Sequence, residues 1–394
     1  MYVALTPDQL RLRDEVQGYF SELVTPEIRA ALAASTGEFG DVTVYKDVIR
    51  QLGTDGWLGM GWPKEYGGQE RSMVDELIFS NAAMVAGVPI PHLTLNTVGP
   101  TIMRYGNEEQ KDFFLPKILK GELHFSIGYS EPGSGTDLAS LRTKAELDES
   151  TNEWVINGQK MWTSLIQYAD WIWMACRTDP DLARHKGLSM ILVPAQAEGV
   201  SYTPVHTIAG VGTSATYYDN VRVPADNLIG GRGGGWSLMT NQLNRERVAL
   251  TSSAPLVHSI ELVTNWARET KNANGVRVID QEWVQILLGR AQARTDALTL
   301  MGWKLAAEID TLSPADASAI KVYGSELAVE VYRALKEIVG PAANIAAGSS
   351  GAVIAGRLER YFRSSLVMTF GGGTNEIQRD IIGYVGLGMP AAQR

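Results

Sequence analysis

The chain has 394 residues, of which 45% are hydrophobic and 20% are charged, and its net charge is −9. This length allows two or three domains with large cores, and no apolar run is long enough to span a membrane. The acidic balance and the lack of a basic run argue against nucleic acid as a partner.

The number of cysteines and the N-terminal sequence indicate the cellular compartment. The single cysteine, Cys176, excludes an intrachain disulfide and a cysteine metal cluster, and the five histidines show no metal-ligand spacing, so no metal site is expected. The N-terminal sequence lacks a basic stretch followed by an apolar one, so we expect no secretory signal. A reducing cytoplasm is the predicted location.

The first 124 residues are predicted to be helical. TPDQ at residues 6–9 is typical of a helix start, because Thr6 can cap, Pro7 fits the first turn and Gln9 can reach back. Leu12, Val16, Tyr19 and Phe20 then share one helical face. GWPKEYGG at residues 61–68 is predicted to be a loop.

Residues 125–230 are predicted to form strands. Bulky and β-branched residues dominate DWIWMACR and LSMILVPA, and TYYDNVRVP alternates before it ends at Pro224. In WVINGQKMWTS the pair Asn157-Gly158 indicates a two-residue hairpin turn.

Residues 231–394 return to a helical period after the glycine-rich GGRGGGW, and Ser313-Pro314-Ala315-Asp316 indicates another helix start. The glycines at 230–235 are interpreted as a domain connector. A nicotinamide-binding fingerprint has a different glycine order and a later acidic residue that is missing here. The predicted domains are therefore 1–124, 125–230 and 231–394.

One acidic residue lies on an apolar helical stripe. Met239, Leu243, Glu246 and Leu250 are spaced four, three and four apart, so Glu246 shares their face. A carboxylate there is costly unless it is paired or functional. On the residues alone, an ion pair with Arg245 or Arg247 is favoured over a catalytic role.

Several motifs together resemble the acyl-CoA dehydrogenase family over nearly the whole chain: FSIGYSEPGSGTDLASL from Phe125, NGQKMWTS, GWPKEYGG, DNVRVPADNLIG and TNEIQR. The resemblance implies an α+β fold with an N-terminal helical domain, a middle β-barrel-like domain and a C-terminal four-helix bundle. It also implies bound FAD. The positions that match flavin contacts are Ile127, Tyr129, Ser130, Gly135, Thr136, Trp162, Ser164, Thr374 and Glu376.

The family's usual catalytic glutamate is missing from the segment TFGGGTNEIQRDII, which starts at Thr369. Gly372 stands at that position. Some family members that act on branched or bulky substrates carry their base in the helix where Glu246 lies, so the resemblance implies that Glu246 is the base and Arg247 a substrate contact. Gly372 keeps a backbone N–H for the thioester oxygen, and Ser130 and Gly373 are the other predicted substrate contacts.

Two segments depart from the family pattern. Family members complete a neighbour's flavin site with an arginine and phenylalanine, where this chain has Thr270 and Ala273, and with a glutamine and paired glycines, where it has Glu337 and Gly340-Pro341. A sister dehydrogenase-like subunit in an α2β2 heterotetramer is the expected partner. The chain resembles the α-type subunits of actinobacterial steroid side-chain acyl-CoA dehydrogenases, which are built this way.

The resemblance also implies a steroid acyl-CoA substrate and an electron-transfer flavoprotein acceptor. Another bulky or branched acyl-CoA, an acyl-CoA oxidase activity and a non-catalytic partner subunit are the alternatives.

Overall fold

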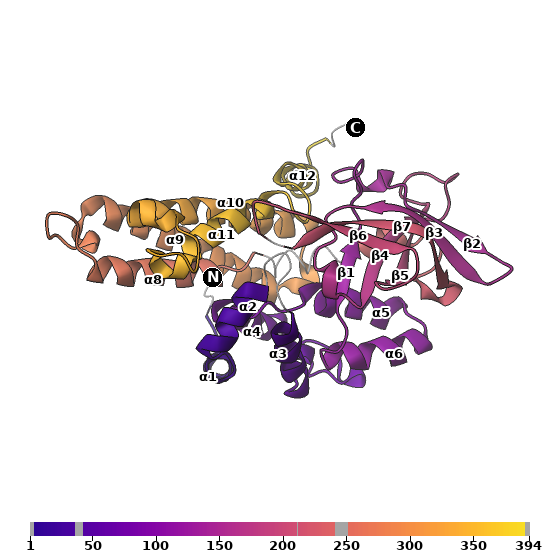
Figure 1. The fold of residues 1–394 in the computed structure, drawn as a ribbon, viewed down its shortest axis with the longest axis horizontal. Helices are drawn as coiled ribbons and strands as arrows, with labels where there is room; N and C mark the ends of the chain where they lie inside the picture. Colours follow the sequence, from indigo (N-terminus) through magenta and orange to yellow (C-terminus); the bar gives the residue numbers. More distant parts are fainter. Residues whose placement is uncertain (1–3, 36–41, 211, 241–250, 391–394) are drawn as a thin grey trace.

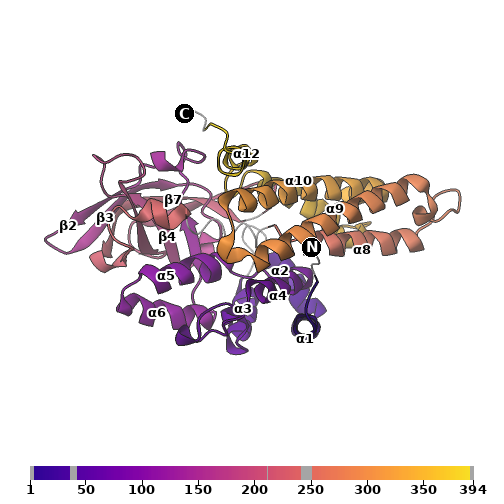
Figure 2. The ribbon, with the colours of Figure 1, turned by 180° about the vertical axis from the view of Figure 1, so that it is seen from behind.

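Three regions follow one another along the chain: helices, a sheet, and helices again (Figure 1). The computed structural model describes residues 4–35, 42–210, 212–240 and 251–390. The long C-terminal helices extend to one side of the sheet, and the N-terminal helices pack below both, as the view from behind also shows (Figure 2). The predicted α+β fold is confirmed.

The N-terminal region is helical, as predicted. Its helices are α1 (Pro7–Leu23), α2 (Pro26–Ser35), α3 (Thr43–Thr54), α4 (Met73–Ala86), α5 (Gly99–Tyr105) and α6 (Glu108–Leu119), with a π-helix, η3 (Leu93–Val98). The predicted helix start is confirmed: Thr6 caps α1, its side chain accepts from the backbone N–H of Gln9, and Gln9 bonds back. Leu12 and Phe20 are buried in the core.

The middle region forms one mixed sheet. Within the described residues its strands are β1 (Phe125–Gly128), β2 (Lys144–Asp148), β3 (Glu153–Lys160), β4 (Trp171–Arg177), β5 (Leu188–Pro194), β6 (Val200–Val205), β7 (Thr213–Pro224) and β8 (Leu228–Ile229). Their order is β6-β7-β3-β2-β4-β5-β8, and β1 pairs in parallel with β4.

Both faces of β4 are buried, so this strand joins two cores. Ile172 and Met174 pack into the interior of the β region with residues of β3 and β7, such as Ile156 and Val221. The alternate residue Trp173 packs on the N-terminal helices. This alternation follows from the two-residue period of a strand, and it fixes the β region on the helices.

The predicted hairpin turn at Asn157-Gly158 is wrong, because β3 runs straight through this pair. The β2–β3 hairpin instead turns after the Asp148–Glu153 pair. Gly158 lies at a bulge, where the register against β7 shifts and φ is 154°. A Cβ on Gly158 would lie 2.6 Å from Oγ1 of Thr143, so the glycine allows a close approach between strands rather than a turn.

The C-terminal region is a helical bundle. Its elements are α8 (Ala254–Glu269), α9 (Glu282–Ala307), α10 (Pro314–Val339), α11 (Arg357–Ser365) and α12 (Asn375–Ile381). The start of α10 is as predicted, with Ser313 and Asp316 forming a capping box. Among the described helices, none combines the length and apolar character that crossing a membrane requires.

Two buried histidines make stability depend on pH. Burial lowers the pKa of His92 to about 4. Burial also lowers the pKa of His124 to about 4, and nearby Lys46 and Arg50 add to this effect while Asp170 opposes it. Among the described residues, Nδ1 of His92 and both ring nitrogens of His124 are buried without a hydrogen-bond partner.

We expect stability to fall as the pH drops from about 6.5 toward 4. In this window the unfolded chain binds protons that the folded chain does not, so each histidine costs about 1.4 kcal/mol per pH unit. Urea unfolding at pH 7, 6 and 5 measures the effect, which His124→Phe should reduce and His185→Gln, at an exposed position, should not. An unchanged slope in His124→Phe would contradict the assignment.

Candidate active site

The two motifs predicted to bind flavin lie side by side. The first leaves the end of β1 and the second leaves the end of β3, and these strands are not neighbours in the sheet. The backbone N–H of Met161 donates to the carbonyl of Ser130 at 2.8 Å. The Ser126 hydroxyl donates to the carbonyl of Ser164, also at 2.8 Å. Tertiary structure therefore brings together segments about 30 residues apart in the sequence.

A buried ion pair between Lys160 and Glu131 links the two motifs. Nζ of Lys160, with a fully buried side chain, lies 2.9 Å from Oε1 of Glu131, whose side chain is 8% exposed. Lys160 also donates to the carbonyl of Tyr129 at 3.1 Å. The carboxylate accepts from the backbone N–H groups of Arg142 and Thr143. One lysine thus links the end of β3 to both ends of the Tyr129–Glu131 segment.

The charge of Lys160 keeps Glu131 ionised. Burial by itself raises the pKa of the Glu131 carboxyl, but the nearby ammonium and the hydrogen bonds from Thr143 and Lys160 lower that pKa overall. A buried carboxylate with this many donors is satisfied, so Glu131 serves as a structural anchor rather than a proton acceptor.

The outer side of the paired motifs is open to solvent. Trp162 is 53% exposed and has a φ of 62°, which is uncommon for a side chain of this size. Gly135 and Thr136 are exposed as well. The exposed indole and the small residues beside it form a surface on which a planar ring system can lie.

Three further residues that were predicted to contact flavin are held by neighbouring side chains. The Tyr129 hydroxyl accepts a hydrogen bond from Nε1 of Trp173 at 3.0 Å. The Ser164 hydroxyl donates to Oγ1 of Thr213 at 3.3 Å. Ile127 is partly buried and packs on the N-terminal core. The side chains of these three predicted flavin contacts are therefore held in place by protein contacts.

The glycine segment 371–373 lies apart from these motifs in the chain, before α12. All three glycines are exposed, and Gly372 and Gly373 have φ values of 68° and 93°. Thr374 caps α12 by accepting from the N–H of Ile377 at 3.3 Å. In both views α12 lies near the end of α10 that approaches the β region (Figure 1 and Figure 2).

Glu376 is exposed in the first turn of α12. Its own backbone N–H lowers the pKa of its carboxyl most, followed by the Thr374 hydroxyl, and Arg379 and Lys321 contribute through their charges. Glu376 is therefore ionised at neutral pH, and its predicted contact with flavin is that of a hydrogen-bond acceptor.

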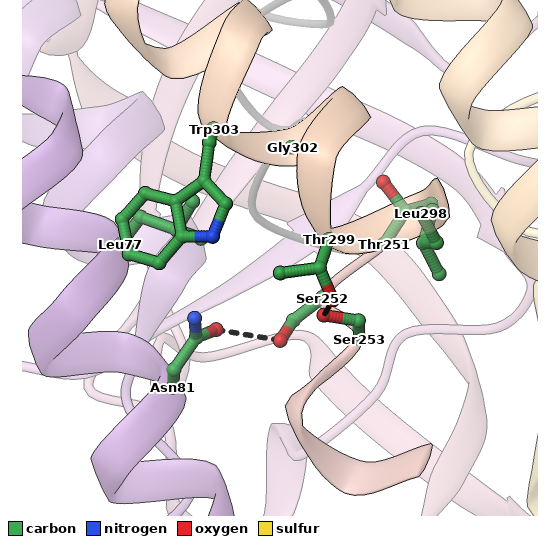
Figure 3. Close-up of a pocket in the computed structure, with 9 residues that line it drawn as sticks. All are labelled: Leu77, Asn81, Thr251, Ser252, Ser253, Leu298, Thr299, Gly302 and Trp303. Atoms are coloured by element: carbon green, nitrogen blue, oxygen red, sulfur yellow. Dashed lines mark hydrogen bonds between the residues drawn. The ribbon is translucent and has the colours of Figure 1, made fainter. Parts of the chain in front are cut away.

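The predicted base Glu246 and its neighbour Arg247 lie outside the described residues, so their roles stay predictions. Met239, before this segment, and Thr251, after it, are both buried. A small cavity of about 10 Å³, the size of one water molecule, lies next to Thr251 (Figure 3). It is lined by Leu77, Asn81, Thr251, Ser252, Ser253, Leu298, Thr299, Gly302 and Trp303.

Hydrogen bonds tie the walls of this cavity together. The Ser252 hydroxyl donates to Oδ1 of Asn81 on α4 at 2.6 Å, and the hydroxyls of Ser253 and Thr299 lie 2.7 Å apart (Figure 3). The chain that follows residues 241–250 is thereby attached to both the N-terminal region and α9. Ser252 and Ser253, which follow residues 241–250 in the chain, are therefore held by these hydrogen bonds.

The segments expected to serve a neighbour's flavin lie at the far ends of the bundle helices. Thr270 and Ala273 belong to the connection between α8 and α9. Glu337 and Gly340-Pro341 line an open hollow of about 450 Å³ at the end of α10, with Arg333, Lys336, Asn344 and Phe362. This hollow is wide enough for part of a ligand or a partner's side chains.

Four polar residues with buried side chains were not predicted: Glu131 and Lys160 between the flavin motifs, and Lys321 and Gln378 beside the glycine segment. Lys321 lies on the buried stripe of α10 with Ala317 and Gly324, which is the same signal that identified Glu246. Lys160 lies at an inward position of β3. A charged residue at a core position was therefore a usable signal in both cases.

Family models match the three regions of the chain in order. Models of the N-terminal, middle and C-terminal domains of acyl-CoA dehydrogenases match residues 6–122, 126–221 and 233–387. Acyl-CoA dehydrogenase FadE26 of Mycobacterium tuberculosis is 56% identical, with 100% of both chains covered.

Solved structures show the same likeness. A chain of the ChsE4-ChsE5 complex from Mycobacterium tuberculosis has a TM-score of 0.93 at 56% identity, with 100% of both chains covered. A chain of the Tcur3481-Tcur3483 steroid ACAD has a TM-score of 0.93 at 45% identity, again with 100% of both chains covered. The chain belongs to the acyl-CoA dehydrogenase family.

Proposed function

We propose that the chain is the catalytic, FAD-binding subunit of a heteromeric acyl-CoA dehydrogenase that oxidises a steroid side-chain CoA thioester. The observation that carries this proposal is full-length similarity, at 45% identity and a TM-score of 0.93, to a chain of a complex described as a steroid ACAD. The similar chain from the ChsE4-ChsE5 complex also belongs to an assembly of two different proteins.

The residues present fit FAD. The exposed Trp162 can cover the isoalloxazine ring, and Ser130, Thr136 and Ser164 can hydrogen-bond its polar atoms. The Lys160–Glu131 pair holds the two motifs at a fixed separation. When bound, FAD supplies the acceptor for the hydride that leaves the β carbon of the acyl group.

The chain's own residues supply the acid–base part of the reaction. Glu246 takes the α proton as a carboxylate, and a double bond forms between the α and β carbons as the hydride leaves. The N–H of Gly372 donates to the thioester oxygen, where negative charge develops. Arg247 contacts the substrate beside the base. Because 371–373 carry no side chains, they leave room for a wide acyl group.

Two rival functions make different predictions. The short/branched chain specific acyl-CoA dehydrogenase of Bos taurus is 27% identical over 96% of this chain, which keeps another branched acyl-CoA as an alternative substrate. Rates on a panel of steroid and branched acyl-CoA thioesters separate these. An acyl-CoA oxidase would release peroxide in air, whereas the proposed enzyme passes electrons to an electron-transfer flavoprotein.

We expect the chain to need a sister subunit for full flavin loading. Glu337 and Pro341 replace a glutamine and a glycine of the family pattern, and an acidic side chain and a residue without an N–H cannot serve a neighbour's pyrophosphate. The purified chain alone should hold little FAD, and the complex with a sister chain should hold about one FAD per copy of this chain. Flavin absorbance and subunit ratios measure this.

Two outcomes would contradict the subunit assignment. Full flavin loading of this chain as a homotetramer would exclude the heteromer. A complex whose flavin content follows the sister chain, and is unaffected by Trp162→Ala here, would make this chain the non-catalytic partner.

A further inference from the structure

Two buried polar side chains lie directly beneath the glycine segment 371–373. Lys321 of α10 is 2% exposed, and its Nζ donates to the carbonyl of Gly373 at 2.8 Å and to Oδ1 of Asn375 at 2.7 Å. Gln378 of α12 is fully buried, and its Nε2 donates to the carbonyl of Gly372 at 3.4 Å. Consecutive carbonyls of the segment are therefore held toward the protein interior.

Holding these carbonyls determines where the next N–H groups point. A peptide bond is planar and trans, so its N–H is directed opposite its C=O. With the carbonyls of Gly372 and Gly373 turned inward, the N–H groups of Gly373 and Thr374 are turned outward, on the exposed side of the segment. Among the described backbone hydrogen bonds, none uses the N–H of Gly372, Gly373 or Thr374.

The backbone conformation of this segment favours glycine. The φ values of Gly372 and Gly373 lie in the left-handed region, and a Cβ on Gly373 would lie 2.5 Å from Nε2 of Gln378. Three successive glycines are intrinsically free to rotate, so a defined direction for their N–H groups needs outside contacts. Lys321 and Gln378 supply these contacts.

The polar atoms around Lys321 form a connected network. Asn375 exchanges hydrogen bonds with Ser325 at 3.1 to 3.2 Å and donates to Glu326 at 3.1 Å. Glu326 in turn accepts from Arg379. Asn375 is thereby fixed, and it fixes the ammonium of Lys321 under the carbonyl of Gly373.

Gln378 has capacity left for a ligand or a water molecule. Its Oε1 is buried, and among the described residues it has no hydrogen-bond partner. A fully buried amide with an unused acceptor is costly in a segment that serves packing alone. This observation is independent of the lysine, and it places a second buried polar side chain against the segment.

We propose that Lys321 and Gln378 are positioning residues for the thioester oxygen. They orient the 371–373 backbone so that the N–H of Gly373 joins that of Gly372 as a donor to this oxygen, and the Lys321 ammonium adds positive charge from the inner side of the segment, opposite the face on which the oxygen lies. The inference rests on the proposed function, in which Glu246 is the base and the glycine segment keeps the backbone donor to the thioester oxygen.

The test compares a buried and an exposed lysine of the helical bundle. Lys321→Met removes the ammonium at similar length, and Lys304→Met on α9 is the matched control, because the Lys304 side chain is 47% exposed and pairs only with Glu308 at 4.0 Å among the described ion pairs. Both variants are prepared as the complex with the sister subunit. The readouts are FAD content, kcat and KM, and the pH at which a bound 3-oxoacyl-CoA ionises to its enolate.

Lys321→Met should lower kcat about tenfold or more while FAD content stays equal and KM changes less than about twofold. The enolate midpoint should rise by about one pH unit, since one unit corresponds to a tenfold loss of stabilisation. Lys304→Met should change none of these. A structural role alone would not move the enolate midpoint in a folded, flavin-loaded complex.

A second variant tests the proposal if the first one does not fold. If Lys321→Met does not assemble, Gln378→Leu, which removes the contact with the Gly372 carbonyl, should raise the enolate midpoint and lower kcat. Unchanged midpoints in folded variants would overturn the proposal. Failure of the parent complex to dehydrogenate any acyl-CoA would instead overturn the proposed function, so the two failures are distinguishable.

Discussion

Replacing Glu246 with glutamine should reduce turnover by about a factor of 10³ while FAD and ligand still bind. The amide keeps the size and polarity of the side chain but cannot take a proton from the α carbon, and general-base catalysis contributes about 10²–10⁴ to a rate. Dye-coupled dehydrogenation measures kcat, and the change in flavin absorbance on adding substrate measures binding.

A control separates the two roles considered for Glu246. Glu261→Gln removes a carboxylate from an exposed position on α8 and should leave kcat unchanged. If Glu246 only pairs with Arg245 or Arg247, Glu246→Gln will instead lower the unfolding midpoint and keep most of the activity. That outcome would remove the chain's proposed base and favour the partner-subunit alternative.

Replacing Lys160 with methionine should destabilise the protein by about 3–5 kcal/mol and empty the flavin site. The change leaves the Glu131 carboxylate, 8% exposed, without its cation, and an uncompensated buried charge has this cost. It also removes the contact between β3 and the Tyr129 carbonyl. Denaturant unfolding and flavin absorbance of the purified complex measure the two effects.

The matched control is Lys144→Met on β2. Lys144 also pairs with a glutamate, Glu146, but its side chain is 48% exposed, so the expected cost is about 0–1 kcal/mol. The double variant Glu131→Gln with Lys160→Met should recover part of the lost stability, because the amide oxygen still accepts from Thr143 and no charge remains. A double variant less stable than Lys160→Met would contradict this account.

Helix starts were predictable because capping is local. Thr6 with Gln9, and Ser313 with Asp316, bond within four residues, so the sequence contains both partners. The turn at Asn157-Gly158 was not predictable in this way. The same two residues suit a turn or a bulge, and the choice depends on Thr143 and on β7, which are distant in the chain.

For the buried lysines, the sequence indicates a buried charge but not its partner. A lysine on an apolar stripe or at an inward strand position is a visible signal, and the same reasoning singled out Glu246. The sequence does not show which oxygen such a lysine binds. Lys160 finds Glu131 about 30 residues earlier, and Lys321 finds Gly373 about 50 residues later.

The sequence by itself determined the family, the α+β order of the regions and the absence of a side chain at Gly372, because motifs, periodicity and residue identity are local properties. Only the tertiary structure decided that the SEPGSGTD and WTS segments share one surface and that Lys321 and Gln378 lie under the glycine segment. These contacts depend on how strands and helices pack, and packing joins residues whose separation in the sequence carries no record of the contact.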